Sequence, residues 1–210
     1  MSVLRLKSLI KTFRGDLRGI AAVEFGLIAP IALLMMLGTV ELGRAVVMAR
    51  RFNLVTAVIG DLVSREHELP DPPATPDPQT EMTAISKAAS LMWQPYDATS
   101  LKFLVMQIRN GAATAKHGLA NQNYVDWPYP MFGATAPAAC SVYPGLPAGM
   151  IPSGQAAIIV NGWYTYKPLF ATLPFATSAT WNWTATSSHS PRVLGCVDYN
   201  VNSCATTCEN

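Results

Sequence analysis

The stretch RGIAAVEFGLIAPIALLMMLGTVELGR, from Arg18 to Arg44, is nearly a membrane-spanning helix by composition. Its run from Phe25 to Val40 holds no charged residue. With the apolar residues on either side, this run approaches the ~20 residues that a helix needs to cross ~30 Å of hydrocarbon. Glu24 stands near the start of the stretch, where an ionised carboxylate in hydrocarbon costs roughly 2.5–3.5 kcal/mol. The stretch therefore predicts a membrane helix that carries a charge in need of a partner.

The residues that flank this run bear on its orientation. Basic side chains precede it, at Arg5, Lys7, Lys11, Arg14 and Arg18. This flank favours a cytoplasmic amino terminus and a periplasmic carboxy-terminal head on a bacterial inner membrane, although Arg44, Arg50 and Arg51 on the far side weaken the bias. A cleaved secretory signal and a plain signal anchor are the alternatives. The run is long for a signal peptide, and no small-x-small cleavage site closes it.

The composition excludes two broad classes of protein. Half of the 210 residues are hydrophobic, 13% are charged, and the net charge is +2. A chain this apolar is not disordered, and a charge this small does not predict a nucleic-acid partner.

The helical pattern continues beyond the apolar run. An apolar face is predicted from spacings of three to five residues, at Leu42, Val46, Ala49, Leu54, Val58, Ile59 and Leu62. No proline falls between Ile31 and Leu69, so a transmembrane and stalk helix is expected over 20–67. The stretch ELPDPPATPDPQT follows, and its five prolines predict an extended linker over 68–79.

The remaining residues, 80–210, predict a head of mixed structure. A short second helix is expected from about Gln79 to Trp93, with Ile85, Ala88, Ala89 and Met92 on one side. Strands are expected over Ser100–Asn110, Gly154–Phe170 and Ala176–His189, with a short one near Tyr124–Trp127. The fold class is therefore α+β: a long helix, a short helix and a small antiparallel sheet.

All four cysteines lie in the carboxy-terminal half, at Cys140, Cys196, Cys204 and Cys208. An even count after an export segment predicts two disulfides in an oxidising compartment. Three pairings are possible, and the sequence does not choose among them. A metal site that includes His189 is the alternative, but the spacings lack the paired CxxC pattern, so no metal is expected.

The sequence shows no catalytic constellation. His67 stands between two glutamates at the end of the expected helix, and His117 falls in an expected loop. His189 precedes Ser190, but no nucleophile-elbow context surrounds the pair. Neither an enzyme nor a cofactor is expected. Aromatic residues in DWPYPMF and GWYTYKP suit packing and subunit contacts better than a carbohydrate or peptide platform.

The amino-terminal motif is more specific. The residues GIAAVEF, Gly19–Phe25, resemble the processing motif of type IV pilins and of their tight-adherence (Flp) branch. The longer string Phe13–Arg44 resembles the TadE/TadG-like family of pilus-assembly proteins, whose members open with an RG-x-AAVEFAL-x-xP segment. Gly26 departs from the family's alanine. YTYKPLF, Tyr164–Phe170, weakly resembles a strand of the same family.

This resemblance implies processing by a prepilin peptidase. The peptidase would cut the Gly19–Ile20 bond and remove the basic leader, 1–19. Glu24 would become the fifth residue of the mature chain, able to pair with the new amino group on Ile20 or on a neighbouring subunit. The alternative for Glu24 is a side chain that reaches the headgroup level of an ordinary membrane anchor. Phe25 would pack against sister helices, and Pro30 would remove one helical hydrogen bond and kink the helix.

The role implied is that of a non-enzymatic minor pilin or pseudopilin, which helps to initiate or assemble the pilus. Its partners would be the peptidase, the major pilin, other minor pilins, and the pilus platform and secretin. The alternative is a signal-anchored periplasmic binding or enzymatic domain unrelated to pili.

Overall fold

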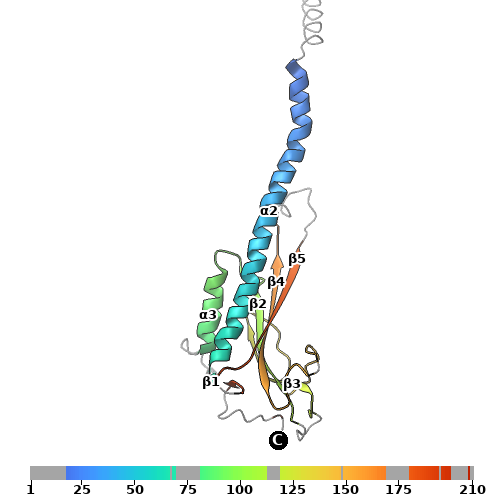
Figure 1. Cartoon of the computed structure of the whole chain (residues 1–210). Coiled ribbons are helices and arrows are strands. Elements are labelled where there is room, and N and C mark those ends of the chain that lie inside the picture. Colours follow the sequence, from blue (N-terminus) through green and yellow to red (C-terminus); the bar gives the residue numbers. More distant parts are fainter. Residues whose placement is uncertain are drawn as a thin grey trace, which may run out of the picture. The chain divides into compact units, whose positions relative to one another are not determined.

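The computed structural model describes residues 18–66, 68–69, 81–112, 119–147, 149–168, 180–193, 195–199 and 208. Its elements, in chain order, are α2 (Arg18–Arg65), β1 (Glu68–Leu69), α3 (Glu81–Trp93), β2 (Lys102–Asn110), β3 (Asn123–Met131), β4 (Ala156–Tyr166), β5 (Trp181–His189) and β6 (Asp198–Tyr199) (Figure 1). The α+β class is confirmed. Most of the expected leader and of the expected linker lies outside the described residues, as do His67 and His117.

The chain divides into two compact units. The first is Met1–Val46, of which the structure describes the amino-terminal part of α2. The second is Val47–Asn210, which we call the head. The head includes the remainder of α2, so this helix contributes residues to both units.

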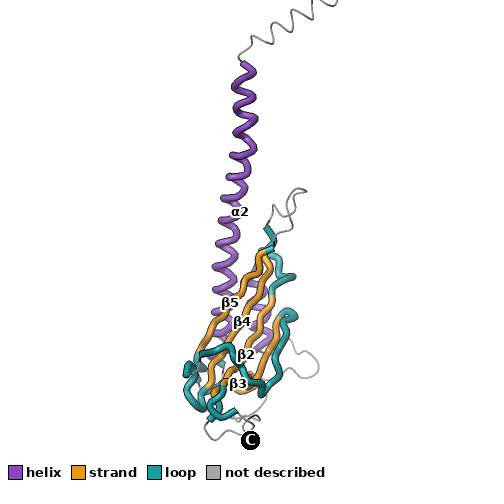
Figure 2. The backbone as a smooth tube through the Cα atoms, turned by 90° about the vertical axis from the view of Figure 1, so that its right-hand side faces the viewer, coloured by secondary structure: helices purple, strands orange, loops and turns teal. Residues whose placement is uncertain are grey.

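Four antiparallel strands in the order β3-β2-β4-β5 form the main sheet of the head (Figure 2). The expected strands are present, and β3 runs further than the short strand expected near it. One edge of this sheet is β3, where prolines at 128 and 130 weaken further pairing and Tyr124 bridges to Val142. The other edge is β5. A separate parallel pair joins β1 to β6.

Both helices of the head lie on one face of the sheet (Figures 1 and 2). Their buried residues recur every three or four positions, as one face of a helix requires. In the head part of α2 they are Met48, Phe52, Val55, Ile59 and Val63. In α3 they are Met82, Ile85, Ala89 and Trp93.

The predicted face of α3 agrees with these contacts at Ile85 and Ala89. The predicted face of α2 is wrong at three positions, because Leu42, Val46 and Leu54 are exposed. Helix α2 is apolar on more than one side, so its periodicity does not single out the side that packs.

Aromatic rings make the contact between helix and sheet. Phe52 is buried, and its ring stacks on Phe103 of β2 at 5.9 Å between centroids. Trp93 of α3 packs edge-on against Tyr164 of β4 at 4.7 Å, and both rings also contact Phe52. Gly162 lies under this cluster: a Cβ there would stand 2.9 Å from Phe103 and 3.0 Å from Phe52.

Polar contacts attach the carboxy-terminal segment to the same sheet. The backbone N–H of Val197 donates to the side-chain oxygen of Gln107 at 2.7 Å, and the indole N–H of Trp127 donates to the carbonyl of Val197 at 3.0 Å. The Gln107 amide in turn donates to Asp126 at 2.7 Å. Each of these groups is largely buried, so leaving one without a partner would cost about 1–3 kcal/mol.

A disulfide between Cys140 and Cys208 links residues that are 68 positions apart. Cys196 is also disulfide-bonded, whereas Cys204 lies outside the described residues. Bridges that close long loops stabilise a domain by roughly 2–5 kcal/mol, chiefly by restricting the unfolded chain. The head therefore has covalent support for its long connections.

We predict that Gly162→Ala destabilises the head by about 1–3 kcal/mol, because the new methyl group overpacks the Phe52 and Phe103 rings. Denaturant unfolding followed by tryptophan fluorescence measures the change. Adding Phe103→Leu to the variant frees volume at that spot and should recover part of the loss. A single substitution as stable as the parent chain would contradict the packing described here.

Candidate assembly site

The expected processing bond lies inside helix α2. Gly19 is the second residue of this helix, and a Cβ placed on it would meet nothing within 4 Å. Ile20, which follows, is 51% exposed. Glycine weakens a helix by about 1 kcal/mol relative to alanine. The backbone at Gly19 and Ile20 is therefore accessible, and the glycine makes the helix locally weaker there.

Glu24 and Phe25 lie one turn further along. Glu24 is exposed, and it is the only charged residue between Gly19 and Val40. Residues four apart share a helix face, so Glu24 lies on the same side of α2 as Ile20. The Phe25 ring is 73% exposed. Proximity of Ile20 and Glu24 is thus built into the helix, and their roles in processing and assembly stay predictions.

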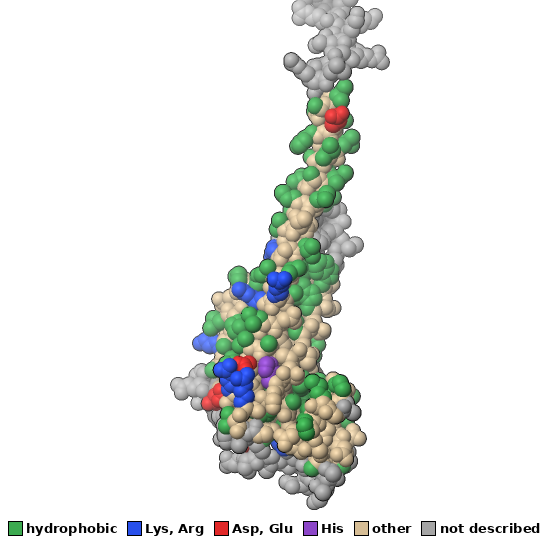
Figure 3. Space-filling view, viewed as in Figure 1, with side chains coloured by type: hydrophobic (Ala, Val, Ile, Leu, Met, Phe, Trp, Pro, Cys, Tyr) green, Lys and Arg blue, Asp and Glu red, His purple; other side chains and the backbone are tan. Residues whose placement is uncertain are grey.

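Apolar side chains project from every side of this part of α2, and Figure 3 shows them as a band along the helix. Exposed members are Ile20, Val23, Phe25, Leu27, Ile28, Ile31, Leu33, Leu34, Met35, Met36, Leu37 and Val40. A helix that is apolar all round requires lipid or other helices around it. Within the described residues, α2 is the one helix long and apolar enough to cross a membrane.

Pro30 lies within α2, and the helix continues through it. The missing N–H of proline leaves one carbonyl of the preceding turn without its helical donor. Such a carbonyl is tolerated in membrane helices when neighbouring groups satisfy it. The kink expected at this position stays a prediction.

Sequence reasoning missed a second carboxylate in α2. Glu41 is 3% exposed and forms an ion pair with Arg44 at 3.7 Å. The spacing of three residues that allows this pair is visible in the sequence. The two acids of this part of α2 therefore differ: Glu41 is buried beside an arginine, whereas Glu24 is exposed among apolar side chains.

The described residues combine an α+β head with one long apolar helix near the amino terminus, which is the class of protein in which such a helix fits a membrane anchor. Residues 19–58 match the TadE-like protein family, which confirms the resemblance expected from the motif that contains Gly19 and Glu24. The match covers about a fifth of the chain and ends within α2. No curated protein and no solved structure matches the chain. The TadE-like segment points to a protein associated with a tight-adherence pilus.

The histidine, cysteine and acidic side chains of the head bear on metal binding and catalysis. Among the described residues, no group of three or more His, Cys, Asp or Glu side chains could hold a metal ion. His189 lies against α2, where a Cβ on Gly60 would stand 2.3 Å from the imidazole ring. Its Nε2 atom is buried and has no hydrogen-bond partner within the described part of the chain. His189 is therefore packed against α2.

The aromatic cluster also holds a perturbed titratable group. Burial raises the pKa of the Tyr164 hydroxyl above its usual value of 10.0, and the negative charge of Asp97 adds to the rise. Asp97 keeps its charge because hydrogen bonds from the Thr99 side chain and backbone hold the pKa of its carboxyl below the usual 3.8. The ionised form of Tyr164 is therefore disfavoured in the folded head.

We predict an alkaline loss of stability that depends on Tyr164. Because its pKa is higher in the folded state, its contribution is complete below pH 10 and is lost as the pH rises through the raised value. Tyr164→Phe, which cannot ionise, should flatten the decline above pH 10 while leaving stability near neutral pH little changed. Urea unfolding across pH 8–11 tests this, and identical pH profiles would exclude the assignment.

Proposed function

We propose that this protein is a minor pilin or pseudopilin of a tight-adherence pilus and that it acts structurally, without catalysis. The observation that carries the proposal is the TadE-like match over 19–58, in which Gly19 and Glu24 keep the pilin spacing on an exposed apolar helix. A helix of this kind serves equally as a membrane anchor and as a member of a helical bundle.

In this proposal the charge of Glu24 has a defined partner. Cleavage after Gly19 creates an ammonium group on Ile20, four residues before Glu24 and on the same helix face. The two charges neutralise each other within one chain, or Glu24 pairs with the amino terminus of a neighbouring subunit. Pairing offsets the cost of placing a carboxylate in an apolar bundle.

The proposed location follows from the basic flank and the cysteines. The amino terminus lies in the cytoplasm, α2 crosses the inner membrane, and the head lies in the periplasm, where the Cys140–Cys208 bridge is stable. The proposed partners are the prepilin peptidase, the major pilin, other minor pilins, and the pilus platform and secretin. The exposed apolar side chains of α2 supply the surface for contacts with other pilin helices.

The first test concerns the Gly19–Ile20 bond. We expect protein purified from cells with an intact pilus system to begin at Ile20, as measured by intact-mass spectrometry and amino-terminal sequencing. Gly19→Val should retain the leader, because a branched side chain blocks close approach to the backbone. An unprocessed chain beginning at Met1 in such cells would rule out the processed form of the proposal.

The second test concerns Glu24. We expect Glu24→Gln to reduce co-purification with pilins by at least about tenfold, because the amino-terminal charge loses its partner in an apolar bundle. Membrane insertion should be unaffected, since the substitution removes a charge from the apolar segment. Glu81→Gln, at an exposed acid on α3, serves as the matched control. Unchanged assembly in the Glu24 variant would contradict the charge-pair role.

A further inference from the structure

The outer face of the sheet, opposite the helices, has two halves of different character. One half is apolar and covered: Leu104, Met106, Ile108 and Ile159 pack under residues of the connecting segments, among them Tyr143, Leu146 and Ile151. The other half lies over the first part of β2, the end of β4 and the start of β5. It is hollowed by an open cavity of about 690 Å³. Small-molecule sites typically occupy roughly 300–1,000 Å³.

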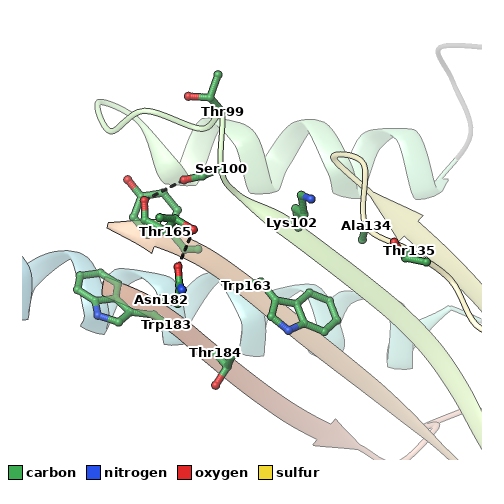
Figure 4. A pocket seen from close by; sticks show the side chains of 11 residues that line it. Thr99, Ser100, Lys102, Ala134, Thr135, Trp163, Thr165, Asn182, Trp183 and Thr184 are labelled. Atoms are coloured by element: carbon green, nitrogen blue, oxygen red, sulfur yellow. Dashed lines mark hydrogen bonds between the residues drawn. The ribbon is translucent and has the colours of Figure 1, made fainter. Parts of the chain in front are cut away.

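The strand register sets the side chains of this cavity in rows. Lys102 of β2 pairs with Trp163 of β4, and Trp163 pairs with Thr184 of β5. The next row joins Thr165 to Asn182. Figure 4 shows the Trp163 indole between Lys102 and Thr184, with Asn182 turned toward Thr165. The Trp163 indole ring therefore has a polar side chain on each side, at positions set by the strand register.

Hydrogen bonds orient one of these polar groups. The Ser100 hydroxyl donates to the Thr165 carbonyl at 3.0 Å, and the Thr165 hydroxyl donates to the side-chain oxygen of Asn182 at 2.9 Å. The carboxamide of Asn182 thus uses its acceptor inside the protein, and its NH₂ group is left to donate. The Thr99 hydroxyl is already engaged with Asp97.

The polar side chains of this cavity that make no hydrogen bond within the described residues are mainly hydrogen-bond donors. Within the described residues, no hydrogen bond is made by the Lys102 ammonium, the Trp163 indole N–H or the Thr184 hydroxyl. None of the eleven lining residues is acidic, and seven carry a non-aromatic polar side chain. Such a lining, with apolar surface beside donors, suits a ligand that combines an apolar face with oxygen acceptors.

Trp163 itself distinguishes this cavity from a packed core. Its side chain is 37% exposed, whereas Trp93 on the helix face is fully buried. A partly exposed indole presents a flat apolar face beside polar groups, which matches a sugar ring with one face of C–H groups and a rim of hydroxyls. The lysine adds a positive charge that a neutral sugar would not use.

We propose that this cavity binds an acidic saccharide, with the sugar ring on the Trp163 indole and a uronate carboxylate on Lys102. Asn182 and Thr184 supply hydrogen bonds to the ring hydroxyls. The inference rests on the geometry of the head alone and does not depend on the proposed pilus role. The proposal assigns a ligand to the open half of the outer face and a binding role to Trp163.

The test is a titration of the full chain in detergent micelles with a galacturonic acid tetramer, compared with its carboxyl-reduced galactose tetramer. Isothermal calorimetry measures affinity, and NMR of ¹⁵N-labelled indole groups reports which tryptophan responds. We expect tighter binding of the acidic tetramer, a shift of the Trp163 signal, and weaker binding at higher salt. Equal affinity for the two tetramers, or binding of neither, would overturn the proposal.

Variants separate the contacts of the site. Lys102→Met keeps the aliphatic stem and should weaken the acidic tetramer about tenfold without altering the neutral one. Trp163→Ala should weaken both by at least about tenfold. Thr184→Glu, at an exposed strand position, should repel the acidic tetramer even if the tryptophan variant folds poorly.

Lys87→Met and Trp181→Phe are controls for the loss of a positive charge and of an indole ring, and they should bind as the parent chain does. Full binding by the Lys102 variant would refute the uronate contact.

Discussion

The head depends on the contact between Phe52 of α2 and the aromatic rings of the sheet. Phe52 contacts Phe103 and Tyr164, and Trp93 of α3 packs against the same rings. One buried phenylalanine therefore joins both helices to two central strands. Burial of an aromatic side chain contributes roughly 1.5–3 kcal/mol, and paired rings add to it. Gly162 makes the contact possible, since a side chain there would separate helix from sheet.

The two faces of the sheet differ because the helices cover only one of them. On the covered face, the apolar side chains are buried against α2 and α3. The opposite face is covered only in part, and its open half is built from hydroxyl, amide and ammonium groups around Trp163. The carboxy-terminal segment is attached to the sheet by hydrogen bonds with Gln107 and Trp127.

Much of the fold could be predicted from local patterns. The long helix, the second helix and the main strands all carry strong periodicity or composition signals, and each appears close to its expected place. The packing face of α2 could not be predicted: Leu54 and Phe52 are both apolar, yet only Phe52 is buried. A helix with apolar residues on several sides satisfies the same pattern in more than one orientation. The choice is made by the shape of the sheet that it meets.

The sequence by itself determined the amino-terminal motif, because the spacing of Gly19 and Glu24 and the length of the apolar run are local properties. The sequence likewise predicted that the cysteines form disulfides, although it did not determine which cysteines pair. Tertiary structure decided the Cys140–Cys208 pairing and the row of Lys102, Trp163 and Thr184. The members of that row are far apart in the chain, and the register of antiparallel strands brings them together. The two cysteines lie outside the strands: the Cys140 N–H donates to the Val125 carbonyl of β3, and Cys208 packs with Tyr124 of the same strand.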